Sequence, residues 1–195
     1  MSLVQISGNA SGTGTLTIAA PNTNSNYTLT LPANTGTLVS TASTFAGTGP
    51  AFSAYLSTNQ TVTSSVVTQI QLDTENFDTA SCYNNTGSTV GGIPAYSFLP
   101  NVAGYYQVNL IVGGTAGTSM VYAGGHIVKN GTSYTRVLVP GFSAASADSS
   151  NSVVIYMNGT SDYLSFSAQL SGTGTMQVAS TQLRTTASAA LIRAA

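Results

Sequence analysis

Few residues in this sequence could carry out chemistry, and the first of them is His126, the only histidine in the 195 residues. A nucleophilic site of the Ser-His-Asp kind needs a base beside a nucleophile and an acid that orients the base. The serines are too numerous to single one out, and the alternating pattern places His126 in the middle of a strand. We therefore expect a core histidine or one at a trimer axis, where three symmetry copies could titrate at about pH 6–7.

The acidic residues form one cluster, Asp73, Glu75 and Asp78. Ca²⁺ prefers six to eight oxygen ligands, so these residues are weak candidates for a metal site, but the EF-hand spacing is absent. A carboxylate pair for sugar hydrolysis would need a defined separation, which nothing here fixes. A solvated loop is the simpler interpretation, and we expect no resident metal and no cofactor.

The remaining reactive groups give no further site. Cys82 is the only cysteine, so an internal disulfide is excluded, and we expect a small buried or loop thiol. The glycine-rich stretches lack the Gly-Lys-Ser/Thr of a phosphate-binding loop. The ten tyrosines lie mostly in predicted strands, where packing is their expected role. An enzyme such as a depolymerase therefore lacks catalytic groups, and we predict that the protein is not an enzyme.

Charge is scarce: 5% of residues are charged and the formal net charge is −1. Weak self-repulsion favours association between copies. The four basic residues are scattered, which argues against nucleic-acid binding. No apolar run reaches the roughly 18–20 residues that span a bilayer, so membrane insertion is not expected. The start of the chain, Met1 to Gln5, lacks the features of a signal peptide.

Alternation of apolar and polar residues, which is typical of β-strands, runs through most of the chain. Thr15–Ile18 and Thr28–Leu31 are two short β segments before a small, polar stretch from Ser40 to Pro50. We interpret residues 1–48 as an extended N-terminal β arm and linker for attachment, because its segments are too short to own a core.

Residues 49–184 are predicted to form a β-sandwich or jelly roll. Strands are expected at 51–57, 61–72 and 104–112, and the Asn-Gly pairs at 130–131 and 158–159 each predict a hairpin. The alternating pattern gives core or trimer-axis candidates, which are Tyr106, Val108, Leu110, His126, Leu164 and Phe166. The alanine-rich residues 185–195 are predicted to be a C-terminal tail, either a short helix or extended.

Four ordered motifs between residues 50 and 184 resemble the C1q-like family. They are Pro50–Tyr55, the Phe98–Tyr106 segment with its "F-x-P-x-x-x-G-x-Y" pattern, the Val128–Gly131 hairpin, and Ser152–Gly159 with Asp162–Leu164. The family's closing "F-x-G-x-x-L" strand is matched only loosely, by Ser180–Leu183. The resemblance implies a ten-strand C1q/TNF-like jelly roll that forms a homotrimer around a threefold axis.

The segment Tyr27–Val39 is similar to N-terminal segments of bacteriophage fibre and virion proteins. Together the two resemblances imply a virion surface protein that is assembled in the host cytoplasm. A fibre usually carries a stalk, and none is present, so we favour a trimeric capsid decoration (cement) protein that binds the major capsid protein or another virion protein through residues 1–40. The alternative is the knob of a tail fibre or tailspike, which would bind a host surface glycan or receptor.

Overall fold

The computed structural model describes residues 49–141 and 145–195, together with residues 11–13, 17, 22, 24 and 26. The β arm predicted for residues 1–48 otherwise lies outside the described residues. The chain divides into two units, Met1–Val39 and Ser40–Ala195. The fold below is that of the second unit.

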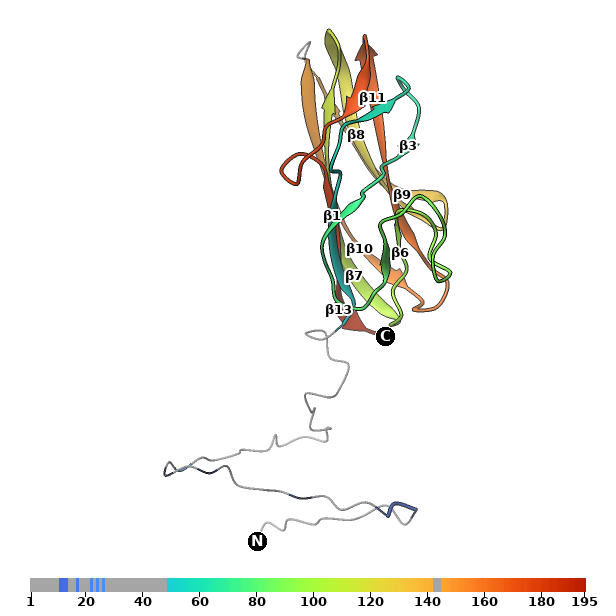
Figure 1. The fold of residues 1–195 in the computed structure, drawn as a ribbon, viewed down its shortest axis with the longest axis vertical. Helices are drawn as coiled ribbons and strands as arrows, with labels where there is room; N and C mark the ends of the chain where they lie inside the picture. Colours follow the sequence, from blue (N-terminus) through green and yellow to red (C-terminus); the bar gives the residue numbers. More distant parts are fainter. Residues whose placement is uncertain are drawn as a thin grey trace. The chain divides into compact units, whose positions relative to one another are not determined.

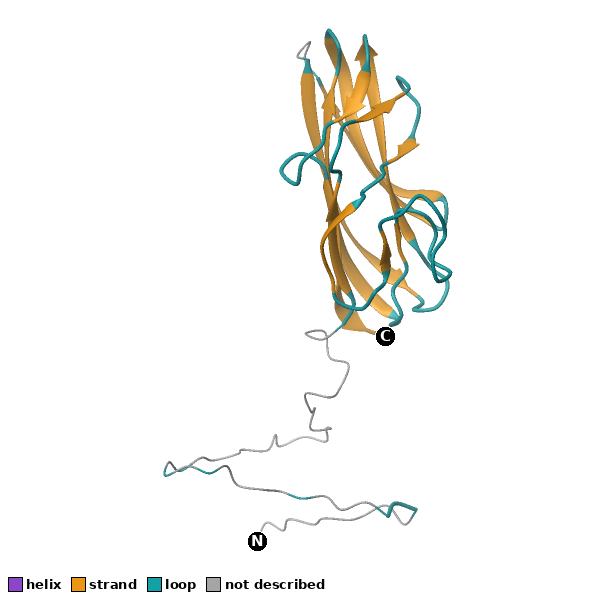
Figure 2. Ribbon diagram, viewed as in Figure 1, coloured by secondary structure: helices purple, strands orange, loops and turns teal. Residues whose placement is uncertain are grey.

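Two antiparallel sheets pack face to face (Figures 1 and 2), and the described residues contain no helix. Sheet 1 consists of β1 (Ala51–Tyr55), β2 (Gln60–Val62), β4 (Thr74–Asp78), β7 (Gly104–Thr115), β10 (Ser146–Met157), β12 (Met176–Val178) and β13 (Thr186–Ala194). Sheet 2 consists of β3 (Thr68–Gln69), β5 (Tyr83–Asn84), β6 (Ser97–Phe98), β8 (Ser119–Lys129), β9 (Thr132–Pro140) and β11 (Leu164–Thr173). The predicted all-β sandwich is confirmed.

The core lies between the two sheets and follows the alternation that the sequence shows. Successive side chains on a strand point to opposite faces, so every second residue of β7 and of β11 points inward. The inward residues are at most 1% exposed: Tyr106, Val108, Leu110 and Val112 on β7, and Leu164, Phe166, Ala168 and Leu170 on β11. The alternation of the sequence in β7 and β11 is therefore an alternation of inward and outward side chains.

The strand predicted over residues 61–72 is wrong, because the structure divides it into β2 and β3. Ser65 lies between them with a φ of 65°, in the left-handed region that interrupts a strand. Its amide donates to the carbonyl of Leu170 at 2.6 Å, which fixes the turn against sheet 2. β2 then joins sheet 1 and β3 joins sheet 2. Strand propensity alone does not report this change of sheet.

The two Asn-Gly predictions have different outcomes. Asn130 and Gly131 have φ values of 51° and 78° and close the β8–β9 hairpin, as predicted. The hairpin predicted at Asn158–Gly159 is wrong, because β10 pairs with β7 in sheet 1 whereas β11 pairs with β8 in sheet 2. The segment between β10 and β11 therefore crosses from one sheet to the other.

Residues 186–194, which the sequence analysis assigned to a tail, form β13 between β7 and β1. Its Ala187, Ala189 and Leu191 are buried in the core. Alanine has a low β propensity, which is why composition did not reveal this strand. The closing strand of the sandwich is therefore β13, whereas Ser180–Leu183, its suggested equivalent, lies in the turn before it.

The first and last residues of the sandwich lie at the same end of it. The amide of Leu191 donates to the carbonyl of Pro50 at 3.1 Å, and the amide of Ala195 donates to that of Ala103 at 3.0 Å. In Figure 1 the C-terminus lies at this end of the sandwich. The opposite end carries the turns between β7 and β8 and between β11 and β12.

Candidate functional site

The predicted core or trimer-axis candidates lie inside a single copy of the chain. Five of the six belong to the hydrophobic core cluster: Tyr106, Val108, Leu110, Leu164 and Phe166. The hydroxyl of Tyr106 donates to the carbonyl of Val102 at 2.7 Å, which satisfies its buried polar atom. Since each of the five is at most 1% exposed, they hold the two sheets together and offer little surface to a second copy.

His126 is buried on the side of sheet 2 that faces away from the core. Its neighbour Gly125 faces inward, because a side chain there would contact Val112, so His126 faces outward. Its Nδ1 lies 3.1 Å from the hydroxyl of Ser133, and its Nε2 is buried without a partner in hydrogen-bond geometry among the described residues. Burial lowers the pKa of His126, the charge of Arg136 lowers it further, and Gln169 partly opposes the shift.

The carboxylates of Asp73 and Asp78 accept hydrogen bonds from neighbouring groups of the chain. Asp73 accepts hydrogen bonds from the amide and the hydroxyl of Ser57, at 2.8 and 2.6 Å. Asp78 accepts from the amides of Ala80 and Tyr83, at 3.2 and 2.7 Å. Burial and the nearby charge of Asp78 raise the pKa of Glu75. Among residues 49–141 and 145–195, no three His, Cys, Asp or Glu side chains come together as metal ligands would.

Cys82 is buried, and its thiol lies 3.4 Å from the carbonyl of Ala80. Burial raises the pKa of this thiol, and the charge of Asp78 adds to the shift against the hydrogen bond from Asn101. The thiolate is the reactive form of cysteine, so this environment disfavours nucleophilic chemistry.

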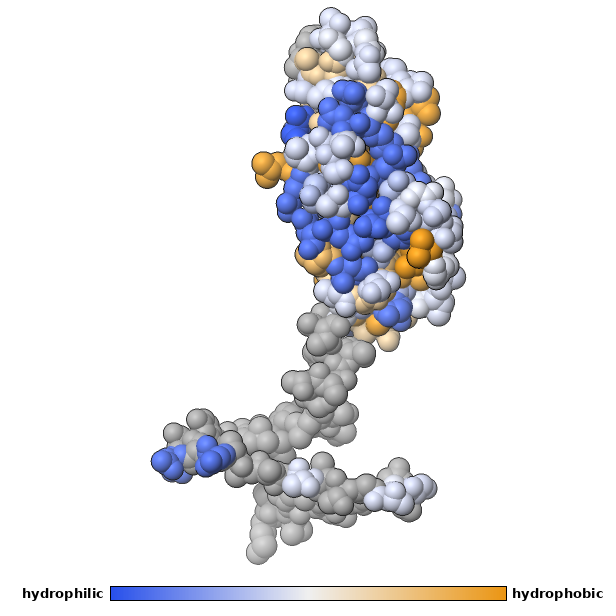
Figure 3. Space-filling model, in the orientation of Figure 1, coloured by the Kyte–Doolittle hydropathy of each residue, from blue (hydrophilic) through white to orange (hydrophobic). Residues whose placement is uncertain are grey.

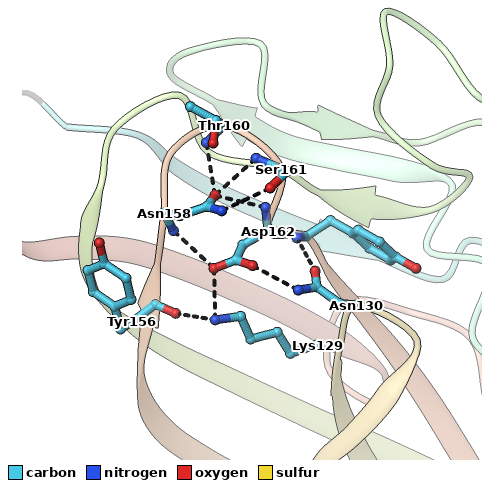
Figure 4. Close-up of polar contacts among 8 residues, drawn as sticks. Lys129, Asn130, Tyr156, Asn158, Thr160, Ser161 and Asp162 are labelled. Carbon is cyan, nitrogen blue, oxygen red and sulfur yellow. Dashed lines mark hydrogen bonds and ion pairs between the residues drawn. The ribbon is translucent and has the colours of Figure 1, made fainter.

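Two of the family-like motifs meet in a polar clamp at one end of the sandwich (Figure 4). The ammonium of Lys129 lies 2.8 Å from Oδ2 of Asp162 and donates to the carbonyl of Tyr156 at 2.7 Å. The amide side chain of Asn130 donates to Oδ1 of Asp162 at 2.8 Å. The β8–β9 hairpin is thereby tied to the segment that leads from sheet 1 into sheet 2.

Asn158 shapes the same segment. Its side-chain oxygen accepts the backbone amides of Thr160, Ser161 and Asp162, at 2.9 to 3.0 Å. Burial alone would raise the pKa of Asp162, but its hydrogen bonds from Lys129, Asn130 and Asn158 and the charge of Lys129 hold that pKa below its ordinary value. Because the carboxylate is fully partnered, we interpret the clamp as structural.

The surface that stands out is the outer face of sheet 1. Its outward residues are Tyr105, Gln107, Asn109 and Ile111 on β7, Ser150, Ser152, Val154 and Tyr156 on β10, Ser188 and Ala190 on β13, and Ser53 and Tyr55 on β1. None of these residues is charged. Tyr105, Ile111, Val154 and Tyr156 are between 38% and 46% exposed. Charged residues lie toward its two ends, where Asp148 on β10 pairs in register with Gly113 and Arg193 on β13 pairs with Tyr105. The face is thus apolar in part and uncharged across its middle.

Polar side chains cross the middle of this face in one hydrogen-bonded row. The amide of Gln107 donates to the hydroxyl of Ser152 at 2.8 Å, and that hydroxyl donates to the side-chain oxygen of Asn109 at 2.9 Å. Asn109 lies 3.5 Å from the hydroxyl of Ser188 on β13. The rings of Tyr105 and Tyr156 meet edge to face at 5.6 Å. These contacts fix the face before any partner arrives.

Sheet 2 differs in part. On its outer side His126, Ser165 and Ser167 are at most 8% exposed, so other parts of the same chain already cover them. Leu138, in register with Gly124, is 39% exposed on that side, and the exposed Arg136, in register with His126, adds a charge. The sequence analysis missed the outer face of sheet 1 because it followed only the inward residues of β7. The signal was present in the alternate residues of the same strand, which are uncharged.

A shallow hollow of about 290 Å³ lies beside β5, lined by Ser81, Tyr83, Asn85, Thr86, Val90 and Ile93 among others. The side-chain amide of Asn84 shapes it by donating to the carbonyls of Ser88, Ile93 and Pro94. No charged residue lines the hollow. No helix in the described part of the chain has the length and apolar character of a membrane span.

Neither a protein-family model nor a curated protein matches this sequence. Solved structures do. Murine APRIL at pH 5.0 has a TM-score of 0.55 at 9% identity, over 74% of this chain and 99% of that one. Eiger TNF from S. frugiperda has 0.52 at 9%, over 75% and 95%. PRD1 vertex protein P5 has 0.50 at 18%, over 74% of each. At such identities the likeness shows the fold alone, and the predicted fold class is confirmed: the chain is a TNF-like jelly roll.

Proposed function

We propose that this protein is a structural protein of a bacteriophage virion, a trimeric capsid decoration (cement) protein that stabilises or coats the head. It could also contribute to adhesion to the host surface. The observation that carries the proposal is the outer face of sheet 1, which is partly apolar, uncharged across its middle and built from ordered side chains. Such a face fits a role in assembly.

The composition of this face favours contact with protein. Interface cores are enriched in aromatic residues and depleted of charged ones. Tyr105 and Tyr156 supply aromatic area, and Val154 lies beside them with 46% of its surface exposed. The C1q/TNF-like resemblance implies three copies around one axis, and a net charge of −1 opposes their association only weakly.

The virion assignment rests on two likenesses. The fold is similar to that of PRD1 vertex protein P5, and Tyr27–Val39 resembles N-terminal segments of phage virion proteins. In this proposal the sandwich stands on the virion surface, and residues 1–40 bind the major capsid protein or another virion protein. The chain is assembled into particles in the host cytoplasm.

The trimer is tested by light scattering of the purified full chain. We expect the mass of three copies for the wild type and of one copy for Val154→Asp, because a charge there would be buried without a partner. Val121→Asp is the matched control, since Val121 is 60% exposed but lies on β8 in sheet 2. If the wild type is a monomer at micromolar concentration, the proposed trimer is wrong.

Attachment is tested with a variant that begins at Thr48. Because the core cluster of the described residues is built from Phe52 onward, we expect this variant to fold and to remain a trimer. Offered to particles that lack the protein, it should fail to bind, whereas the full chain should bind. Equal binding by the two forms would show that the arm is not the anchor.

The alternative function, the receptor-binding knob of a tail fibre or tailspike, is favoured by the hollow beside β5. Its lining offers the uncharged hydroxyl and amide groups of Ser81, Asn85 and Thr86 beside the apolar Val90 and Ile93. That chemistry fits a neutral sugar. Saturation-transfer NMR with N-acetylglucosamine would test this, with Asn85→Ala as the variant. Loss of host-cell binding in Asn85→Ala, together with a location of the protein on the tail and not on the head, would favour the fibre.

A further inference from the structure

The turn Ser180–Thr185, between β12 and β13, carries a leucine that nothing in the described part of the chain covers. Leu183 is 90% exposed. In Figure 1 the loop projects from the side of the sandwich in dark red, and Figure 3 shows an apolar group standing out there. Single exposed apolar residues are common on protein surfaces, so exposure by itself indicates no function. What distinguishes this turn is how firmly it is held.

Hydrogen bonds fix both ends of the turn to the sandwich. The amide of Thr181 donates to the carbonyl of Leu56 at 2.9 Å, and the amide of Ser180 donates to the side-chain oxygen of Asn59 at 2.7 Å. Thr185 is fully buried, donates to the carbonyl of Ala179 at 2.6 Å and accepts from the amide of Gly113 at 3.2 Å. The exposed side chain is therefore presented on a fixed support.

The backbone of the turn is strained. Thr181 has a φ of 89°, which a β-branched residue adopts only at an energetic cost. Its carbonyl accepts the amides of Arg184 and Thr185, both at 3.0 Å, so the strained conformation is enforced by its neighbours. Strain of this kind persists where the surrounding structure dictates it, and it is found often at functional sites such as ligand clamps.

The turn is also joined to the outer face of sheet 1. The guanidinium of Arg184 lies 2.6 Å from the carboxylate of Asp148 on β10. Asp148 is paired in register with Gly113, where a side chain would come within 2.9 Å of Arg184. The glycine thus leaves room for the arginine. Ile111 and Ser150, the next outward pair on these strands, belong to the outer face itself.

We propose that Leu183 is an intermolecular anchor, which packs onto the outer face of sheet 1 of a second copy of this chain. The inference rests on the trimer of the proposed function. A second copy is the occupant that this position favours, because the turn continues the outer face of sheet 1 at its Asp148 end and the Asp148–Arg184 pair balances the charge there. A rigid apolar side chain that becomes buried at the contact is typical of a residue that dominates an interface.

The test uses the full chain and its Leu183→Ser, Leu183→Gln and Leu183→Met variants. Circular dichroism should show the same fold for all, because the side chain contributes nothing to the core. Sedimentation over a dilution series should show that Leu183→Ser and Leu183→Gln raise the concentration of half-dissociation at least tenfold. Leu183→Met should stay near the wild type, because it keeps an apolar side chain of similar size.

Val121→Ser is the control for loss of an exposed apolar residue elsewhere. If it weakens the trimer as much as Leu183→Ser, or if Leu183→Ser dissociates like the wild type, the anchor is wrong while the trimer stands. If the wild type is itself a monomer, the proposed trimer fails first. If Leu183→Ser stays a normal trimer but no longer binds particles, the leucine contacts a capsid protein and the inference is overturned.

Discussion

Lys129 and Asp162 are brought within 2.8 Å of each other from two turns that are 33 residues apart in the sequence. The side chains are 22% and 13% exposed, and each makes further hydrogen bonds in the clamp. The pair therefore joins a hairpin of sheet 2 to the crossing between the sheets.

Asp162→Ala should destabilise the sandwich by about 1–3 kcal/mol, since it leaves the Lys129 charge and the Asn130 amide without their acceptor. Asp148→Ala, in the more exposed pair with Arg184, should cost about 0–1 kcal/mol. Urea unfolding at one protein concentration measures both. Equal losses would show that the clamp contributes no more than a surface ion pair.

The clamp also predicts a dependence on pH. The pKa of Asp162 lies below its ordinary 3.8 in the folded state, so the unfolded chain binds the proton first. The contribution of Asp162 to stability is fully present above the ordinary pKa of 3.8 and is lost as the pH falls through the lower pKa of the folded state. The wild type should therefore lose more stability between pH 5 and about pH 2 than Asp162→Asn does. Parallel unfolding curves would contradict the shift.

His126 should act in a different range. Its pKa in the folded state is lowered from 6.5. As the pH falls below 6.5, the unfolded chain binds a proton at His126 before the folded chain does, so the free energy of unfolding decreases until the pH reaches the folded pKa. His126→Gln should lack this loss. The two proteins are compared by urea unfolding at about pH 7.5 and about pH 5.5. An equal drop in His126→Gln would place the titrating group elsewhere.

Removal of residues 186–195 should prevent folding, because β13 lies in the middle of sheet 1 and buries Ala187, Ala189 and Leu191. Removal of residues 193–195 alone should be tolerated, since these residues lie beyond the buried part of the strand. Circular dichroism and yield of soluble protein report the outcome. A protein that folds without β13 would support the prediction that residues 185–195 are a tail outside the sandwich.

Chelation with EDTA should leave the melting temperature largely unchanged. The carboxylate oxygens of Asp73 accept hydrogen bonds from Ser57, and those of Asp78 accept from the amides of Ala80 and Tyr83. These oxygens are therefore not arranged as ligands of a cation. Calorimetry with and without EDTA measures this. A large drop that Ca²⁺ reverses would show that these side chains rearrange around a metal.

The inward faces of β7 and β11 could be predicted because burial imposes a period of two on the sequence. β13 could not, since alanine packs well there only because β7 and β1 lie on either side. The crossing after Asn158 was missed for a similar reason: an Asn-Gly pair indicates a turn but not the sheet that receives the next strand. The Leu183 turn depends on contacts with Leu56 and Asn59, more than 120 residues away.

The position of β1 has a mechanical consequence. The chain enters the sandwich at β1, which is paired with β13 along all five of its residues and with β4 on the other side from Phe52 to Tyr55. Suppose that the arm holds the protein to a particle and that tension acts along the axis of β1. The hydrogen bonds to both neighbours then carry the load together in shear and must break together. A knob tethered in this way would resist detachment by flow better than one that could be peeled off bond by bond.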